Sequence, residues 1–369
     1  MLRTAPAVFA VGDYYQIMAP VEGETLFWVQ VGADKYHDAS NGIMNSLSHV
    51  HRVTIPMQVL DAAKSYTVFI KSVVERKPYF PETGETLVYS YDFSPVPEQD
   101  IRAYCIADTH SLVTEPVQAA VHYGKIDLLI LNGDIIDHSG EPEDFLNIYR
   151  ICEALTGGRI PVVFARGNHD MRGRYAERFA DYIPNQNGNT YYSFRLGSIW
   201  GVILDCGEDK ADEHPEYGFT VVCHSFRGQQ SVFLNQLIAK AEAEYAAPGV
   251  KVRLVICHMP FTQRDSAPFD IEEAIYREWA FLLRESIKPD LMLCAHTHAA
   301  EIRYPGCDAD HYGQPCPVVI EAEYNGKDHW AGCGICFREQ AAEVIFTDSV
   351  GWTKTAASVS YGANGKEAR

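Results

Sequence analysis

Short apolar runs and helical stretches alternate along the chain after about residue 100. The apolar runs cover 102–107, 126–131, 160–165, 253–257 and 291–294. Each run is almost free of polar residues, which predicts strands that are buried on both faces of a sheet. The segments 114–123 and 145–155 lie between the first three runs and predict helices. Strands that alternate with helices predict an α/β architecture in which helices cover the sheet.

The first 98 residues have a different pattern. Runs at 26–31, 50–55, 66–70 and 87–91 alternate apolar with polar residues and are separated by Gly, Asp, Asn and Pro clusters. Several short strands at such spacing predict an antiparallel sandwich. Two prolines within 94–98 end the last strand and indicate a linker. We therefore expect an all-β domain over 1–98, of the immunoglobulin or fibronectin III-like kind, followed by an α/β domain over 99–369.

The segment 60–66 resembles the turn before a late strand in fibronectin III-like domains. In those domains a tyrosine hydroxyl ties the corner, and the resemblance implies this role for Tyr66.

The later segments are expected to build a second sheet and the rim of a site. Tyr191–Phe194 and Trp200 predict strand residues of a second sheet, which 317–320 and 342–346 would complete. The polar insertion from Asp205 to about Arg227 is expected to shape the mouth of a site, or to be a loop without a role in binding. The last residues, 362–369, predict a frayed tail.

The chain has 369 residues and a formal net charge of −18. A surface this negative repels nucleic-acid backbones and anionic lipids, and no basic run opposes it, so we expect neither nucleic acid nor membrane as a partner. The N-terminus lacks the apolar core of a signal peptide, and no stretch approaches the roughly 18 apolar residues of a membrane span. We expect a cytoplasmic protein, with a removed leader as the open alternative.

The ten cysteines allow two interpretations. Cys105, Cys257 and Cys294 lie inside apolar runs, where cysteine acts as a small hydrophobe. Cys333 and Cys336 have the spacing of a zinc or redox pair, but no matched second pair accompanies them. Free thiols in a reducing compartment are the preferred interpretation, and a structural zinc site is the alternative.

Polar stretches directly follow the five apolar runs. They are Asp108-Thr109-His110, Gly133-Asp134-Ile135-Ile136-Asp137, Gly167-Asn168-His169-Asp170, His258 and His296-Thr297-His298. Active sites of α/β sheets collect at the carboxyl ends of strands, so these side chains should meet there. Carboxylate, amide and imidazole ligands together suit manganese, iron or zinc better than calcium or magnesium. A carboxylate such as Asp134 can bridge two ions.

The ordered set resembles the calcineurin-like metallophosphoesterase superfamily, whose pattern is DxH, GDxxD, GNH(D/E), H and GHxH. The match covers about residues 100 to 300 and departs only at Ala295, where the family has glycine. The resemblance implies a four-layer α/β/β/α sandwich with two metal ions. It assigns Asp108, His110, Asp134 and His298 to the first metal, and a bridging Asp134 with Asn168, His258 and His296 to the second. It makes His169 a phosphate contact or proton donor, with Asp137 orienting its ring.

The resemblance implies hydrolysis of a small phosphate monoester or diester by a hydroxide that the two metals generate from water. Arg166 and Arg172 flank the third motif and could bind a phosphate oxygen in a bidentate contact. His138 stands where protein phosphatases of the superfamily often have arginine, which argues against a phosphoprotein substrate but keeps His138 as a substrate contact.

Two alternatives remain open at this point. Purple acid phosphatases also place a β-sandwich before this fold, and a phosphomonoesterase of that kind is one alternative. They have a metal-ligating tyrosine in the second motif, which residues 133–138 lack, so we do not expect a tyrosinate–iron site. The other alternative is a binding or scaffold protein without turnover, although no expected ligand is missing. The sequence does not predict the oligomeric state.

Overall fold

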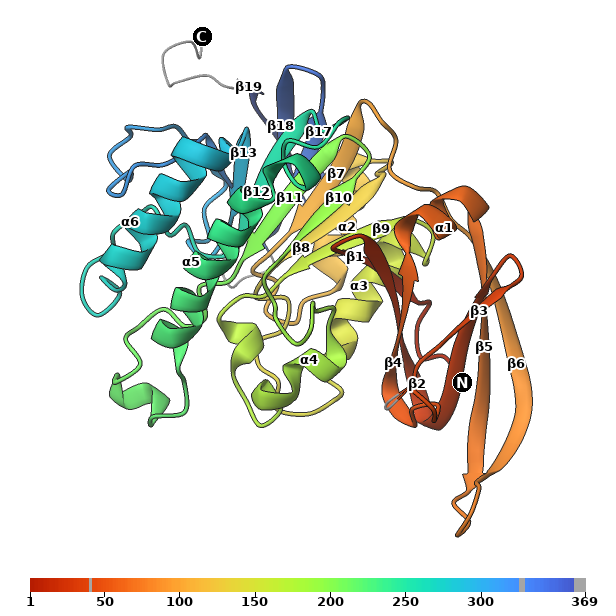
Figure 1. Ribbon diagram of the computed structural model, residues 1–369. Coiled ribbons are helices and arrows are strands. Elements are labelled where there is room, and N and C mark those ends of the chain that lie inside the picture. Colours follow the sequence, from red (N-terminus) through yellow and green to blue (C-terminus); the bar gives the residue numbers. More distant parts are fainter. Residues whose placement is uncertain (40–41, 325–328, 362–369) are drawn as a thin grey trace.

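The computed structural model describes residues 1–39, 42–324 and 329–361, so the predicted tail at 362–369 lies outside the described residues. Two β-sheets stack at its centre (Figure 1). The large sheet has thirteen strands in the order β19-β18-β17-β7-β8-β9-β1-β2-β5-β6, with β16 on β17 and with β3 and β4 on β2. The second sheet has six strands in the order β10-β11-β12-β13-β15-β14.

The middle of the large sheet contains the strands that the apolar runs predict. Parallel pairing joins β7 (Ile101–Ile106), β8 (Leu128–Asn132) and β9 (Pro161–Ala165). Three C-terminal strands extend this sheet beyond β7, namely β17 (Trp330–Phe337), β18 (Ala341–Asp348) and β19 (Thr353–Ser360), with β16 (Glu323–Tyr324) beside β17. The expectation that 342–346 completes the second sheet is therefore wrong. The reason is that β17 pairs antiparallel with β7, at Cys333 opposite Cys105, and covers an edge that would otherwise be open.

The second sheet contains the expected aromatic strands. Its members are β10 (Tyr192–Leu196), β11 (Ile199–Leu204), β12 (Val252–Cys257), β13 (Leu291–Cys294), β14 (Glu301–Arg303) and β15 (Val318–Ile320). Parallel pairing joins β11, β12, β13 and β15. The strand assignments are thus confirmed for 192–194, for Trp200 and for 318–320, while Tyr191 and Pro317 directly precede their strands.

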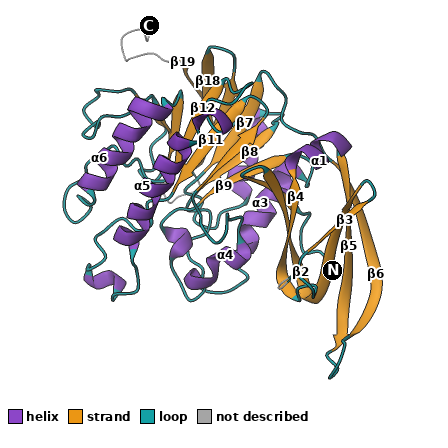
Figure 2. Ribbon diagram, in the orientation of Figure 1, coloured by secondary structure: helices purple, strands orange, loops and turns teal. Residues whose placement is uncertain are grey.

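Helices cover the outer faces of both sheets. The main ones are α2 (Thr114–Tyr123), α3 (Leu146–Thr156), α4 (Phe179–Tyr182), α5 (Cys223–Ala239) and α6 (Glu273–Leu282). Short 3-10 helices cover His169–Met171, Ala176–Arg178, Pro215–Tyr217 and Ala241–Ala243, and a π-helical turn covers Leu283–Ile287. In Figure 2, α5 and α6 lie against the second sheet, away from α3.

Three apolar clusters define the layers. Buried residues of α2 and α3, such as Ala119 and Ile148, pack on one face of the large sheet. Buried residues of α5 and α6, such as Leu234 and Trp279, pack on the second sheet. The third cluster lies between the sheets and continues into the N-terminal strands. The order helix, sheet, sheet, helix is the four-layer arrangement that the resemblance implies.

The N-terminal segment is hydrogen bonded into the large sheet. It contains β1 (Ala7–Val11), β2 (Tyr14–Val31), β3 (Asp34–His37), β4 (Ser48–Pro56), α1 (Met57–Ala63), β5 (Ser65–Glu75) and β6 (Glu82–Asp92). The runs at 26–31, 50–55, 66–70 and 87–91 all fall in these strands. However, β1 pairs parallel with β9, at Phe9 opposite Val162, so the first strand continues the sheet that carries the motifs. An immunoglobulin or fibronectin III-like domain is not confirmed, and a boundary at residue 98 remains a proposal.

Tyr66 does not tie a local corner. Its buried hydroxyl donates a 2.7 Å hydrogen bond to the Gly158 carbonyl, after α3. The same tyrosine stacks on Tyr91, with ring centroids 5.1 Å apart. Tyr66 therefore ties the N-terminal strands to the α/β layers instead of closing a turn within its own sheet.

Candidate metal centre

Each of the five motifs begins where a parallel strand ends. The turns after β7, β8 and β9 carry Asp108, Asp134 and Asn168, and the turns after β12 and β13 carry His258 and His296. Because the sheets are stacked, the two sets of strand ends supply side chains to one place.

Several candidate ligands lie in the left-handed region of backbone conformation. Asp108, His110, Asp134, His296 and His298 have φ values of 50°, 43°, 52°, 66° and 52°. Residues other than glycine seldom adopt this region, and such strain persists where the surrounding structure enforces it, commonly at functional sites. Here the first two turns enforce it together, because the amides of Asp108 and His110 donate to the carbonyls of Gly133 and Asp134 at 3.1 and 3.0 Å.

The candidate ligands form two compact groups. In the first, the ligand atoms of Asp108, His110 and His298 all lie within 4.8 Å of one another. The second group contains Asp134, His258 and His296 at the same spacing. The two groups are joined because His258 Nε2 lies 3.2 Å from Asp134 Oδ2 and 3.7 Å from Asp108 Oδ1.

Asn168 extends the second group. Its Oδ1 lies 3.1 Å from His296 Nδ1, so the amide oxygen points toward the same space as the imidazole. The structure thus brings together all seven residues that the sequence predicts as ligands, and their assignment to two metal ions stays a prediction.

Buried polar atoms without a partner show that this space suits a cation. Among the described residues, Asp108 Oδ1 and His258 Nε2 are buried and have no hydrogen-bond partner. His258 Nδ1 donates to the Asn132 carbonyl at 2.7 Å, which orients Nε2 toward the carboxylates. Burial disfavours the charged imidazole, but the Asp134 carboxylate outweighs it and raises the pKa of His258 to about 10. A proton on His258 in this way occupies a position that a metal ion can take instead.

Two glycines leave the room that the ligand turns need. A Cβ on Gly167 would lie 2.2 Å from Asp134 Oδ1, and a Cβ on Gly133 would lie 2.5 Å from His258 Nδ1. Any larger residue at either position would displace a ligand, so these glycines are required by close approach.

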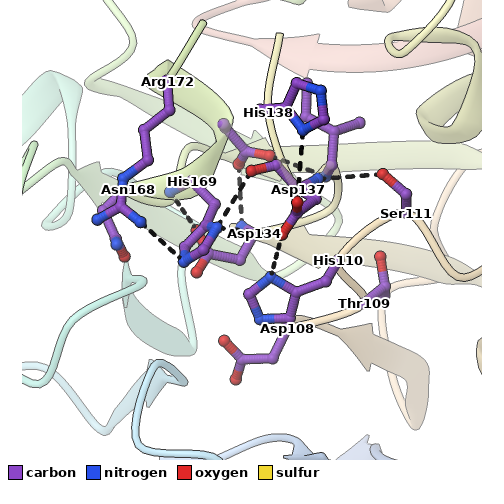
Figure 3. Close-up of polar contacts among 12 residues, drawn as sticks. Asp108, Thr109, His110, Ser111, Asp134, Asp137, His138, Asn168, His169 and Arg172 are labelled. Carbon is purple, nitrogen blue, oxygen red and sulfur yellow. Dashed lines mark hydrogen bonds and ion pairs between the residues drawn. The ribbon is translucent and has the colours of Figure 1, made fainter. Parts of the chain in front are cut away.

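His169 lies at the edge of the ligand groups, between Asp137 and Arg172 (Figure 3). Its Nδ1 donates to the Asp137 carbonyl at 3.1 Å and lies 3.4 Å from the Asp137 carboxylate. Its Nε2 accepts from Arg172 Nη1 at 3.0 Å. Because the Arg172 guanidinium can only donate, these contacts point Nδ1–H toward Asp137 and Nε2 toward Arg172.

The three predicted substrate contacts have different surroundings. Arg172 uses its Nε and Nη2 for two 2.8 Å hydrogen bonds to Glu208 and turns Nη1 toward His169. Arg166 is paired with buried Asp205 at 2.8 Å and lies over the Phe226 ring. His138 is more than half exposed, and its Nδ1 lies 3.4 Å from Asp137. Of the three, Arg172 and His138 lie beside the His169–Asp137 pair, and Arg166 lies in the wall behind Arg172.

Sequence reasoning missed several residues that hold the site. Buried Asp170 accepts hydrogen bonds from the amides of Asp134, Ile136 and Gly167 at 3.0, 3.1 and 2.8 Å. Its place in the third motif was a signal that could have revealed it. Glu208 and Tyr324 carried no local signal, although the Tyr324 ring lies 5.4 Å from the His110 ring and 5.7 Å from the His298 ring.

All ten cysteines are free. Cys333 and Cys336 both lie in β17, three residues apart, so their side chains point to opposite faces of the sheet. That geometry prevents them from binding one ion together, and the zinc alternative loses its basis.

A family model matches this chain, and two solved structures are similar to it to different degrees. The family model of calcineurin-like phosphoesterases matches residues 101–300. Among solved structures, purple acid phosphatase PPD1 from yellow lupin (Lupinus luteus) seeds has a TM-score of 0.60 at 13% identity, over 98% of this chain and 75% of that one. A predicted phosphoesterase from Streptococcus pneumoniae TIGR4 has a TM-score of 0.33 at 11% identity, over 70% of this chain and 98% of that one. No curated protein matches.

The fold and the paired ligand groups define a phosphoester hydrolase. Since the family model covers more than half of the sequence, the chain belongs to the calcineurin-like phosphoesterase family. The scaffold alternative is therefore not supported. Within the described ranges, no helix combines the length and the apolar character needed to cross a membrane.

Proposed function

We propose that this phosphoesterase hydrolyses small phosphate monoesters or diesters with two transition-metal ions, drawn from manganese, iron and zinc. The observation that carries the proposal is the pair of ligand groups, which meet at His258 and contain buried atoms without partners. Asp108, His110, Asp134 and His298 would hold one ion, and Asp134, Asn168, His258 and His296 the other. When bound, such ions activate water as the nucleophile and withdraw charge from phosphate oxygens.

His169 and Arg172 would handle the phosphate and the leaving group. A phosphate oxygen between His169 Nε2 and Arg172 Nη1, which are 3.0 Å apart in the free site, would replace their mutual hydrogen bond. To act as the acid, His169 would first take a second proton from solvent at Nε2 while Nδ1–H stays bonded to Asp137, and would then donate the Nε2 proton to the departing oxygen. Imidazole fits this step because His169 lies outside both proposed ligand sets and its nitrogens remain free to exchange a proton.

Metal reconstitution tests the proposal. The protein is stripped with a chelator, reloaded with manganese, zinc or iron, and assayed with p-nitrophenyl phosphate and bis-p-nitrophenyl phosphate. We expect two ions per chain by calorimetry and turnover that returns with metal. Asp134→Asn should reduce turnover on the order of a hundredfold or more, because one carboxylate serves both groups.

Asp181→Asn is the matched control, since Asp181 is exposed and pairs with Arg178 on the surface. The preferred ester decides between monoesterase and diesterase. Two tightly bound ions without turnover of either ester would contradict the proposed function.

A further inference from the structure

A cavity of about 760 Å³ adjoins the proposed catalytic residues. Arg172 forms part of its wall, and Arg172 Nη1 lies 3.0 Å from His169 Nε2. Glu208 also lines this cavity. The next residue in the same loop, Asp209, lines a smaller hollow together with His296, so the loop separates the cavity from the candidate metal ligands. Arg172 therefore borders both the large cavity and the proposed phosphate position beside His169.

Part of the cavity lining, called the apolar wall below, is formed by Met171, Tyr217, Val221, Val222 and Phe226. The Val222 side chain is 72% exposed. An apolar group that covers it would be bound more tightly, because removing apolar surface from water is favourable. The volume lies within the range of cavities that bind small organic molecules.

The basic residues of the cavity lining lie beside carboxylates, and only the pairs of Arg166 and Arg172 include a buried partner, Asp205 and Glu208. Arg166 pairs with Asp205, Arg172 pairs with Glu208 in two hydrogen bonds, and Arg174 lies 3.6 Å from Glu141. The lining also contains exposed Glu177, and Glu216, which pairs with Lys210 at 3.1 Å. A second anionic group on a substrate would thus enter a space whose cations are paired with carboxylates and that holds the acidic side chain of Glu177, which opposes its binding.

The pairing of Arg172 is built into the loop that closes the cavity. Glu208 is buried, its carboxylate receives the Arg172 hydrogen bonds, and its backbone carbonyl accepts from buried Arg227. The Tyr217 hydroxyl lies 3.3 Å from the same carboxylate. Because Glu208 is fixed from several sides, Arg172 keeps its counter-charge when a ligand enters.

We propose that this cavity binds the leaving group of the substrate, and that the enzyme prefers phosphoesters of apolar, uncharged alcohols or phenols over those with a second anionic group. This inference rests on the proposed function and on His169 as the proton donor. The apolar wall supplies the attraction, and the paired cations with their acidic neighbours supply the discrimination.

Phenyl, 1-naphthyl and 4-carboxyphenyl phosphates test the preference, or the corresponding methyl phosphate diesters if diesters are the preferred class. We expect kcat/KM of the reconstituted enzyme to be roughly tenfold higher for the naphthyl ester than for the phenyl ester, and lowest for the carboxyphenyl ester. Glu177→Lys should raise kcat/KM for the carboxyphenyl ester severalfold and leave that for the phenyl ester unchanged.

Val222→Asn removes part of the apolar wall without weakening the fold, because Val222 is the N-cap of α5 and asparagine is a preferred N-cap residue. It should lower kcat/KM for the naphthyl ester about three- to tenfold and spare the phenyl ester. Val232→Asn is the matched control, since Val232 is 57% exposed on the same helix and lines a different cavity. Equal kcat/KM for phenyl and naphthyl esters, or an equal loss on both in Val222→Asn, would overturn the leaving-group site while the proposed function stands. Turnover of no ester with any metal would refute both.

Discussion

A single buried carboxylate, Asp170, holds the turns that carry two of the proposed ligands, and its removal is the sharpest test of the site's architecture. Oδ2 accepts from the amides of Asp134 and Gly167, and Oδ1 accepts from the amide of Ile136. Burial, and after it the charge of Asp134, raises the pKa of Asp170 above its ordinary value. The carboxylate is therefore costly to bury, and these three hydrogen bonds offset that cost.

The two substitutions of Asp170 differ in the number of amides that they leave unpaired. In Asp170→Asn the amide oxygen can keep the bonds to Asp134 and Gly167, but its NH2 then faces the amide of Ile136. One buried N–H without a partner costs about 1–3 kcal/mol. Asp170→Ala leaves all three without a partner, so the expected loss in unfolding free energy is on the order of 5 kcal/mol.

Urea unfolding of the metal-free protein measures these losses, and calorimetric titration with manganese or zinc measures the effect on the ligands. We expect metal affinity to fall about 10- to 100-fold in Asp170→Asn, since the carboxylate orients the turns and does not bind the ion itself. Asp181→Asn, on the surface, should stay within about 0.5 kcal/mol of the wild type. If Asp170→Ala unfolds at the wild-type urea midpoint, the carboxylate does not hold these turns. If Asp170→Asn is more stable than the wild type, the cost of the buried charge exceeds the value of its hydrogen bonds.

Three further predictions concern residues around the same centre. Glu208→Gln should lower kcat about tenfold more for alkyl phosphates than for p-nitrophenyl phosphate, because poor leaving groups need the proton that His169 supplies beside Arg172. Glu216→Gln, on the same loop, is the control. If it changes kcat comparably, the effect belongs to the loop and not to the Arg172–Glu208 pair. Burial raises the pKa of Glu321 from 4.5 to about 8, so the native state keeps a proton that the unfolded chain loses, and the stability of the metal-free protein should fall as pH rises across this interval. Urea midpoints of Glu321→Gln should lack that component, and an identical pH dependence in both proteins would show that Glu321 does not titrate in this range. Gly167→Ala should abolish tight metal binding in a calorimetric titration, because the new Cβ would lie 2.2 Å from Asp134 Oδ1; wild-type affinity would mean that the turn can move aside.

The sequence identifies the candidate ligands that the structure brings together, because their signals are local. An apolar run of five or six residues followed at once by Asp-x-His or Gly-Asn-His identifies both the strand and the residue at its end, as with β7 and Asp108. Parallel strands then place such residues at one edge without further information. The same locality explains why the strands of the N-terminal segment were found, although their partners were not.

Long-range pairing is what the pattern could not supply. Val8 and Pro161 are opposite each other in β1 and β9, and Cys333 is opposite Cys105 in β17 and β7. An alternating or apolar run does not predict which sheet edge its strand will join, because every strand offers the same backbone hydrogen bonds. Glu208 was missed for a related reason, since its role depends on Arg172, 36 residues earlier in the chain.

The placement of the ligands depends on a few polar contacts that cross between the two sheets. Burial of the apolar surfaces between the two sheets stabilises their packing. It does not set the position of one sheet relative to the other, since burial of apolar area is not directional. Asn132, at the end of β8 in the large sheet, makes directional contacts to the second sheet. Its carbonyl accepts from His258 Nδ1 at 2.7 Å, after β12, and its side-chain amide donates to Glu321 Oε2 at 2.7 Å, after β15. The backbone carbonyl of His258 accepts a 2.7 Å hydrogen bond from the amide of Ala295, the residue before His296. Because these contacts run through candidate ligands of the second group, the packing of the two sheets also sets the geometry of the proposed metal centre.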